Sequence, residues 1–193
     1  MAEPEPVGLL LTAEQIRARV AELGARITDD YAGREPFLIG ILKGSLVFMA
    51  DLVRAIDLSV RVDFMSITSY GDGSNSGVVR ILKDLDESIT GADVILVEDI
   101  IDTGLTLTYL LNTLRARGPA SLAVCGLLDR SARRIVEVPL AYKGFDIPDE
   151  FVIGYGLDHE GRYRNLPEVL GVRDMDALAD PGVVARALES AAG

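Results

Sequence analysis

Acidic and hydroxyl side chains are concentrated in residues 98–106, which read Glu-Asp-Ile-Ile-Asp-Thr-Gly-Leu-Thr. They follow an apolar run at 94–97, typical of a buried strand, and precede leucines at helical spacing up to Leu114. A turn from strand to helix can offer main-chain N–H groups, two hydroxyls and a helix dipole to a phosphate. The adjacent carboxylates of Glu98 and Asp99 only accept hydrogen bonds, which suits the paired hydroxyls of a ribose. The stretch therefore predicts a site for a ribose phosphate.

The single acids of this stretch have a simpler interpretation. Asp99 or Asp102, taken alone, could merely cap the following helix, because Asp is common at that position. A cap leaves the rest of the string unexplained. In an open parallel sheet ligands bind at the carboxyl ends of the strands, which is where this string falls.

The sequence offers few residues for disulfide, zinc or histidine-based chemistry. The single cysteine, Cys125, lies in an apolar stretch and is predicted to be a small buried hydrophobe, so an internal disulfide and a cysteine-rich zinc site are excluded. The single histidine, His159, is predicted to be an exposed loop side chain. One histidine excludes a His-rich metal site, and its loop position argues against a histidine-based triad.

Composition narrows the class of protein. The 193 residues, 49% of them hydrophobic, suffice for one well-buried domain over 1–193. The net charge of −11 argues against nucleic acid as a partner, because phosphate backbones are bound by clustered Lys and Arg. The apolar runs are shorter than the roughly 20 residues that a membrane span needs, and the N-terminus is acidic where a secretory signal is basic. A cytoplasmic protein without membrane contact is predicted.

The elements that would hold this site alternate between strand and helix. Thr12 and Gln15 have capping-box spacing ahead of an opening helix. The apolar run 37–42 predicts a buried strand that enters a turn at Lys43, and a helix is expected from Ser45 to about Ile56.

The next segments predict a hairpin and a further strand. Alternation at 60–64 indicates one strand, residues 69–77 a mobile loop, and 78–83 the returning strand. Residues 121–128 indicate another buried strand. Strand, helix and strand in this order predict a parallel sheet with right-handed crossovers, and the tail from Asp174 is expected to form a short helix.

With these motifs the sequence resembles the purine phosphoribosyltransferases, in particular the bacterial hypoxanthine-guanine branch, from about Leu38 to Leu166. Residues 1–11, an N-terminal arm, and 174–193, the tail, lie outside the clear resemblance. The resemblance implies an α/β, type I phosphoribosyltransferase fold, a parallel sheet core flanked by helices. It also implies a small hood formed by the N-terminal helix and the strands near the C-terminus.

The reaction implied by this resemblance is purine salvage. Hypoxanthine or guanine and phosphoribosyl diphosphate would give IMP or GMP and diphosphate, in a homodimer or homotetramer. Magnesium would be required, because diphosphate otherwise meets a strongly acidic protein.

The resemblance also implies roles for individual residues, with Asp102 as the general base near N7 of the purine. Phosphoribosyl diphosphate would be bound by Lys43, Gly44, Ser69, Tyr70, Glu98, Asp99, Asp102, Thr103, Gly104, Leu105, Thr106 and Arg164. The purine would be bound by Arg130, Phe151, Val152 and Asp158, and magnesium by Glu98, Asp99 and Asp158.

Several of these roles have a specific form in the family. Lys43 and Gly44 match a diphosphate-binding loop in which the bond before the lysine is often cis. Ser69 and Tyr70 begin a lid that would exclude water from the reacting sugar. Phe151 would lie against the purine ring, while the main chain of the next residue reads its edge.

The sequence departs from the family at Arg130, where a lysine normally donates to the 6-oxo group. Arginine also donates, but its planar fork is larger than an ammonium, and Arg133 or Arg134 could share the task. Two alternatives therefore stay open: a phosphoribosyltransferase for xanthine, adenine or a pyrimidine, and an RNA-binding nucleotide-sensing regulator on the same fold. The regulator would need a basic face, and the excess of 30 acidic over 19 basic residues argues against one.

Overall fold

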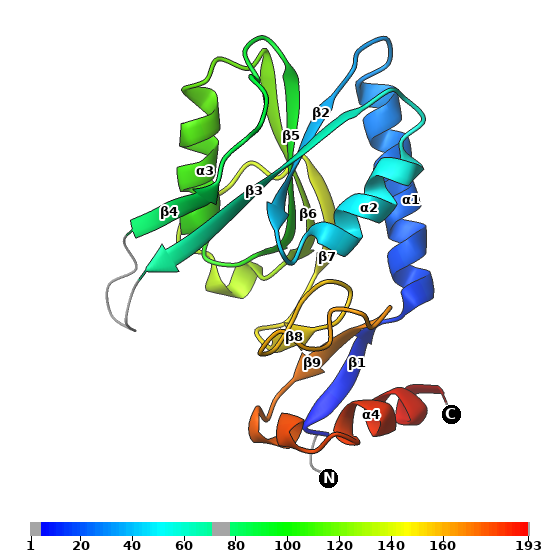
Figure 1. The fold of residues 1–193 in the computed structure, drawn as a ribbon. Coiled ribbons are helices and arrows are strands. Elements are labelled where there is room, and N and C mark those ends of the chain that lie inside the picture. Colours follow the sequence, from blue (N-terminus) through cyan, green and yellow to red (C-terminus); the bar gives the residue numbers. More distant parts are fainter. Residues whose placement is uncertain (1–4, 71–77, 193) are drawn as a thin grey trace.

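The computed structural model describes residues 5–70 and 78–192, and its larger sheet carries the predicted parallel strands (Figure 1). The strands of this main sheet are β2 (Phe37–Leu42), β3 (Arg61–Tyr70), β4 (Val78–Lys83), β5 (Asp93–Ile101), β6 (Ser121–Asp129) and β7 (Tyr142–Asp146). Their order is β4-β3-β2-β5-β6-β7, and all neighbours are parallel except the β3–β4 hairpin. The predicted hairpin and parallel core are confirmed.

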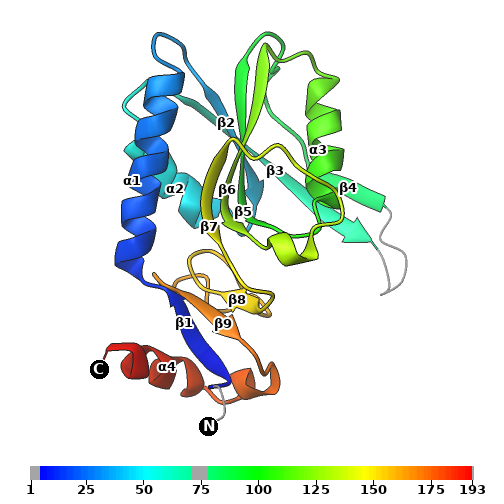
Figure 2. The same ribbon diagram turned by 180° about the vertical axis from the view of Figure 1, so that it is seen from behind.

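Helices cover both faces of the main sheet, as Figures 1 and 2 show. The helices α1 (Ala13–Asp30) and α2 (Leu46–Ala55) lie on one face, and α3 (Leu105–Arg115) lies on the other. Successive side chains of a strand point to opposite faces, so Leu38 packs in the cluster with α1 and α2, whereas Phe37 and Ile39 pack with α3. Burial on both faces explains why β2 is a continuous apolar run.

The opening helix starts at the predicted capping box. The Gln15 N–H donates to the Thr12 hydroxyl at 3.1 Å, and the Thr12 N–H donates to the Gln15 side chain at 2.9 Å. At Gly24, a Cβ would lie 2.4 Å from the main-chain oxygen of Ala55. A glycine is therefore needed where α1 crosses the end of α2.

A second, smaller sheet forms the hood, and its composition corrects one prediction. It contains β1 (Val7–Leu11), β9 (Val169–Val172) and β8 (Phe151–Ile153), in the order β1-β9-β8, with antiparallel pairing. The N-terminal helix was expected in the hood, but α1 packs on the main sheet instead. The N-terminal strand takes that place, because its apolar residues pair with β9 and are buried there.

The tail forms the predicted short helix, α4 (Val183–Ala192), after a short 3-10 helix at Asp176–Ala179. Figure 1 shows α4 across the outer side of β1 and β9. Val183, Val184 and Ala187 are buried in one cluster with Val7 and Leu170. The tail therefore covers the hood sheet. No helix within residues 5–70 and 78–192 is long and apolar enough to cross a membrane.

Candidate active site

Two cavities lie beside the carboxyl end of β5. The Lys43 cavity, of about 290 Å³, is lined by Lys43, Gly44, Asp99, Ile100, Asp102, Arg130, Phe151, Val152, Leu157, Asp158 and Arg164. The Thr103 cavity, of about 230 Å³, is lined by Ile41, Ile67, Glu98, Ile100, Ile101, Asp102, Thr103, Gly104, Thr106 and Leu107. Ile100 and Asp102 line both, so Asp102 lies where the two cavities meet.

The strand β5 is longer than the sequence predicted, and this separates its two acids. The apolar run predicted a strand over 94–97, whereas β5 continues to Ile101. Adjacent strand residues point to opposite faces, so Glu98 lines the Thr103 cavity and Asp99 lines the Lys43 cavity. Their carboxylates therefore lie on opposite sides of the strand end.

The Thr103 cavity contains the predicted phosphate turn at the start of α3. Gly104 precedes the helix with φ 84°, a left-handed conformation, and a Cβ there would lie 2.3 Å from the Val136 main-chain oxygen. The N–H groups of Ile135 and Val136 donate to the Thr103 main-chain oxygen at 2.9 and 3.1 Å, which holds the turn in place. The Leu105 side chain is exposed and lines neither cavity, so only its main chain belongs to the turn.

One wall of the Lys43 cavity is the turn between β2 and α2, in which the Leu42–Lys43 peptide bond is cis. A Cβ on Gly44 would lie 1.5 Å from Asp99 Oδ2, so the Asp99 carboxylate rests directly on the glycine backbone. Gly156 approaches from the other side with φ 98°, and a Cβ there would lie 2.2 Å from the Gly44 main-chain oxygen. Glycine is therefore required at Gly156, where a side chain would meet backbone, whereas a side chain at Gly44 would displace the Asp99 carboxylate.

The facing wall carries Asp158 and Arg164. The Arg164 guanidinium pairs with Asp158 at 2.5 Å and also donates to the main-chain oxygen of Gly156 at 2.6 Å. The Gly161 N–H donates to the second Asp158 oxygen at 2.7 Å. The carboxylate and the guanidinium are thus held in place, each with about a third of its side chain exposed.

The acids at the end of β5 have unusual electrostatics. Desolvation by burial, with the negative charge of Asp99 beside it, raises the pKa of Glu98 well above its ordinary value. Burial also raises the pKa of Asp99, and Asp158 adds to the rise, although the Ile100 N–H and the Arg164 charge oppose it. A nearby cation or hydroxyl donors would stabilise the ionised form of buried carboxylates of this kind.

The carboxylates of this site suit a divalent cation that is also bound by substrate phosphates. Within residues 5–70 and 78–192, no group of three or more His, Cys, Asp and Glu side chains is arranged to hold a metal ion. Magnesium is commonly bound by one or two carboxylates together with substrate phosphates, not by a cage of protein ligands alone. Asp99 and Asp158 line the same cavity and match that mode.

Arg130 lies on the Lys43 cavity with only 6% of its surface exposed. Its Nη2 donates to the Glu150 main-chain oxygen at 2.6 Å, and its Nη1 lies 3.5 Å from Asp102 Oδ2. Among the described residues, Arg130 Nε and Asp102 Oδ1 have no hydrogen-bond partner. The guanidinium therefore lines the cavity, while its Nε is buried inside the protein.

The neighbouring cations do not share its position. Arg133 pairs with Asp149 and Arg134 pairs with Asp129, and neither arginine lines the Lys43 cavity. The prediction that one of them assists Arg130 is wrong in this structure, because both side chains are held by carboxylates elsewhere.

Phe151, which lines the Lys43 cavity, packs against His159. The Phe151 side chain, 39% exposed, meets the ring of His159 edge-on, with 5.9 Å between centroids and 86° between planes. His159 is therefore half-buried against Phe151, and its prediction as an exposed loop side chain is wrong. Val152 is buried beneath. Ile100 and Leu157 also line the cavity and carried no polar group that sequence reasoning could single out.

The structure describes two predicted residues, Ser69 and Tyr70, only in part, and it does not describe the predicted loop that follows them. Ser69 and Tyr70 end the backbone of β3, and their side chains lie outside the part of the structure that is described, as does the segment 71–77. The lid stays a prediction. Cys125 is buried in the main core as expected, and its desolvation raises the pKa of the thiol.

Comparison with known proteins agrees with this architecture. The family model of the phosphoribosyl transferase domain matches residues 7–160. A hypoxanthine-guanine phosphoribosyltransferase of Mycobacterium avium is 54% identical over 165 residues, covering 82% of this chain and 81% of the relative.

Solved structures of phosphoribosyltransferases are also similar to this chain. The structure of a hypoxanthine-guanine phosphoribosyltransferase from Bacillus anthracis is 47% identical with a TM-score of 0.82, covering 85% of this chain and 97% of that one. The hypoxanthine phosphoribosyltransferase of Trypanosoma cruzi, in complex with the product IMP, is 43% identical with a TM-score of 0.82, covering 90% and 98%. The chain therefore belongs to the phosphoribosyltransferase family, and within it to the hypoxanthine-guanine phosphoribosyltransferases.

Proposed function

We propose that the chain, acting as one catalytic domain over 1–193, converts hypoxanthine or guanine and phosphoribosyl diphosphate to IMP or GMP and diphosphate. The observation that carries the proposal is the position of Asp102, which lines both cavities. A transfer at the anomeric carbon needs the sugar phosphate to be held while the base enters on one face of that carbon and diphosphate leaves from the other. The names of the relatives, and the product IMP bound to the T. cruzi enzyme, support this choice of base.

The 5-phosphate is assigned to the Thr103 cavity. The turn from Asp102 to Thr106 offers main-chain N–H groups and two hydroxyls at the N-terminus of an eleven-residue helix, where the helix dipole favours an anion. The ribose would then reach past Glu98 and Asp99, whose carboxylates accept its hydroxyls.

Diphosphate and base are assigned to the Lys43 cavity. Lys43, the Gly44 amide and Arg164 supply donors and positive charge for diphosphate. The exposed Phe151 ring offers a stacking surface for the purine, and the Val152 main chain offers polar groups to its edge. Arg130 would donate to the 6-oxo group.

Magnesium would be held by Asp99 and Asp158 together with diphosphate oxygens, with Glu98 on the ribose side. When bound, it would offset the negative charge that develops on the leaving diphosphate. Asp102 would accept the N7 proton of the purine as N9 bonds to the sugar, while Arg130 keeps that carboxylate paired. Ser69 and Tyr70 would close over the diphosphate and keep water from the anomeric carbon.

Two further features, the oligomeric state and the location, belong to the same proposal. The working protein is a homodimer or homotetramer, and its location is cytoplasmic. A different base (xanthine, adenine or a pyrimidine) would leave the chemistry unchanged, and Arg130 is the residue that would decide it. An RNA-binding regulator is disfavoured by the net charge of −11.

The test is nucleotide formation from phosphoribosyl diphosphate with hypoxanthine, guanine, xanthine and adenine supplied separately, each with and without magnesium. Rapid, magnesium-dependent formation of IMP and GMP is expected, with little product from adenine. Turnover of another base alone would overturn the assigned substrate and keep the transfer chemistry. Absence of turnover with every base would overturn the enzymatic function.

A further inference from the structure

Tyr155 has a backbone conformation that is rare for a large side chain. Its φ is 48°, and the glycines on either side, Gly154 and Gly156, have φ of 96° and 98°. A bulky residue in the left-handed region costs free energy and persists only where the surrounding structure enforces it. Such positions cluster at functional sites, and this one is three residues before Asp158.

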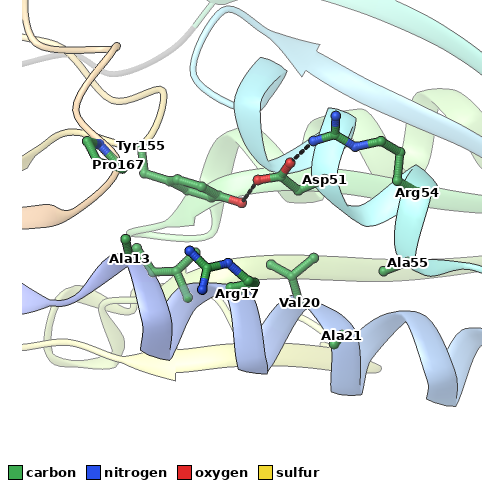
Figure 3. Close-up of a pocket in the computed structure, with 10 residues that line it drawn as sticks. Ala13, Arg17, Val20, Ala21, Asp51, Arg54, Ala55, Tyr155 and Pro167 are labelled. Atoms are coloured by element: carbon green, nitrogen blue, oxygen red, sulfur yellow. Dashed lines mark hydrogen bonds and ion pairs between the residues drawn. The ribbon is translucent and has the colours of Figure 1, made fainter.

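The Tyr155 side chain points toward Asp51 of α2 (Figure 3), and it does not line the Lys43 cavity. It is 6% exposed, and its hydroxyl donates to Asp51 Oδ2 at 2.6 Å. Asp51 also pairs with Arg54 through its other oxygen. Burial, reinforced by the Asp51 carboxylate, raises the pKa of the Tyr155 hydroxyl, so it remains a donor.

This hydrogen bond lines a surface cavity of about 400 Å³ between α1 and α2. Figure 3 shows the Tyr155 ring reaching over this cavity to Asp51 and the Arg17 side chain of α1 beneath it. Tyr155 and Asp51 line neither the Lys43 cavity nor the Thr103 cavity. Any effect of the pair on the site must pass through the segments that carry it.

On the side of Tyr155, that segment is rigidly bonded. The Tyr155 N–H donates to the Leu166 main-chain oxygen at 2.8 Å, and the Gly156 N–H donates to that of Arg164 at 3.0 Å. The Arg164 guanidinium returns to Gly156 and pairs with Asp158. Tyr155 is therefore attached to the wall that presents Asp158 and Arg164.

On the side of Asp51, the segment is α2, which begins directly after the Lys43–Gly44 turn. The two segments already touch at the cavity, where Gly156 packs on the main-chain oxygen of Gly44. Asp51 lies seven residues beyond Gly44, roughly 10 Å along a helix. Two separate contacts, Gly156 with Gly44 and Tyr155 with Asp51, thus join the same two walls.

We propose that Tyr155 and Asp51 are positioning residues for diphosphate binding. One contact alone is a pivot about which the two walls can tilt, and the second contact removes that freedom. The hydrogen bond therefore sets the spacing between Lys43 and Gly44 on one wall and Asp158 and Arg164 on the other. The inference rests on the proposed function, because it assumes that these groups bind phosphoribosyl diphosphate.

The purine side of the site is held by other contacts. Phe151 and Val152 lie in β8, which is paired with β9, and Arg130 is held by the Glu150 main-chain oxygen. Loss of the Tyr155 hydroxyl should therefore affect phosphoribosyl diphosphate and not the base. This asymmetry separates positioning from a general loss of structure.

The test compares Tyr155→Phe with Tyr142→Phe in steady-state kinetics. Tyr142 is a matched control: it is 4% exposed, and its hydroxyl donates to Asp30 Oδ2 at 2.8 Å, away from both cavities. Tyr155→Phe should raise KM for phosphoribosyl diphosphate about tenfold, or ~1.4 kcal/mol. The kcat and the KM for hypoxanthine should stay within about twofold. Tyr142→Phe should lower Tm about as much as Tyr155→Phe does, and should leave kcat and both KM values unchanged.

Substitutions of Asp51 test the same hydrogen bond from its acceptor side. Asp51→Ala should reproduce the KM effect of Tyr155→Phe, and the double variant should add little to either, because both remove one bond. Asp51→Asn, which keeps an acceptor, should restore most of the affinity. Arg54→Ala, which breaks only the exposed ion pair, should change nothing.

Two outcomes would overturn the inference: an unchanged KM for phosphoribosyl diphosphate in Tyr155→Phe, or an equal rise in Tyr142→Phe. Failure of the proposed function gives a different result, since the wild-type protein would then turn over no base. In that case calorimetric titration with magnesium and phosphoribosyl diphosphate decides the inference alone. Equal binding by wild type and Tyr155→Phe, or no binding by either, would overturn it.

Discussion

The Arg130 guanidinium lies 3.5 Å from the Asp102 carboxylate, at the point where the two cavities meet. The pair is incomplete within the described residues, since Arg130 Nε and Asp102 Oδ1 lack hydrogen-bond partners. Under the proposed function, a 6-oxopurine would offer an N–H to the Asp102 carboxylate and a carbonyl oxygen to the Arg130 guanidinium. In the proposed reaction, the same two residues would link proton transfer to recognition of the base.

Asp102→Asn should abolish most turnover, because an amide keeps the shape of the carboxylate and cannot accept the proton. We expect kcat to fall about 10²- to 10⁴-fold, the usual contribution of a positioned base. The KM for phosphoribosyl diphosphate should change only a few-fold, since the main chain of the 103–106 turn is retained. Turnover equal to the wild type would remove the catalytic role of Asp102.

Arg130→Met should weaken the use of hypoxanthine and guanine, because it removes the donors to the carbonyl and leaves the Glu150 main-chain oxygen unpaired. The loss in kcat/KM should be about 10- to 150-fold, as for a hydrogen bond to a charged group. Arg130→Lys should keep much of this activity and change the ratio between the two bases.

Arg133→Ala is the control for Arg130, since Arg133 pairs with Asp149 outside the cavity and is half-exposed. It should leave kcat/KM within twofold. An equal loss in both variants would mean that the general positive charge matters, and not the placement of Arg130.

Phe151→Ala should raise KM for the purine and spare phosphoribosyl diphosphate, because the exposed ring lines the Lys43 cavity. Loss of a stacked aromatic surface predicts an increase of about tenfold. The Tm should change little, since 39% of the residue is exposed. An equal loss of affinity for both substrates would show that the residue is structural.

Asp63 should make the stability of the protein sensitive to acid. Burial acts to raise the pKa of its carboxyl, but the N–H groups of Phe64 and Asp86 and the Lys83 ammonium outweigh it and lower the pKa. A lowered pKa means that ionised Asp63 stabilises the fold above its unfolded value of about 3.9. That stability is lost as the pH falls through the folded pKa.

Asp63→Asn should therefore lower the free energy of unfolding by about 1–3 kcal/mol at pH 7, with the difference from wild type shrinking below about pH 4. Urea unfolding across this pH range measures it. Asp180→Asn is the control, because Asp180 also has a lowered pKa but is exposed, and its loss should be small. A difference that stays constant with pH would contradict the role of the Asp63 charge.

Local features of this protein were predictable from the sequence because they depend on residues close together in the chain. The capping box of Thr12 and Gln15, the buried strand 37–42 and the turn between β5 and α3 are of this kind. Resemblance to a family then identified residues far apart, such as Lys43 and Arg164, that the structure brings to one cavity.

Only the tertiary structure decided the features that depend on distant partners. The apolar arm at Val7 becomes a strand because β9, about 160 residues away, supplies its hydrogen bonds. The strand β5 runs on through Glu98 and Asp99 because β6 pairs with it to Ile101, and the pleat then turns the two acids apart. Sequence by itself determined which groups could bind a ribose phosphate and a purine. Packing between distant segments decided which groups face one another, because burial and strand pairing depend on partners that local sequence does not specify.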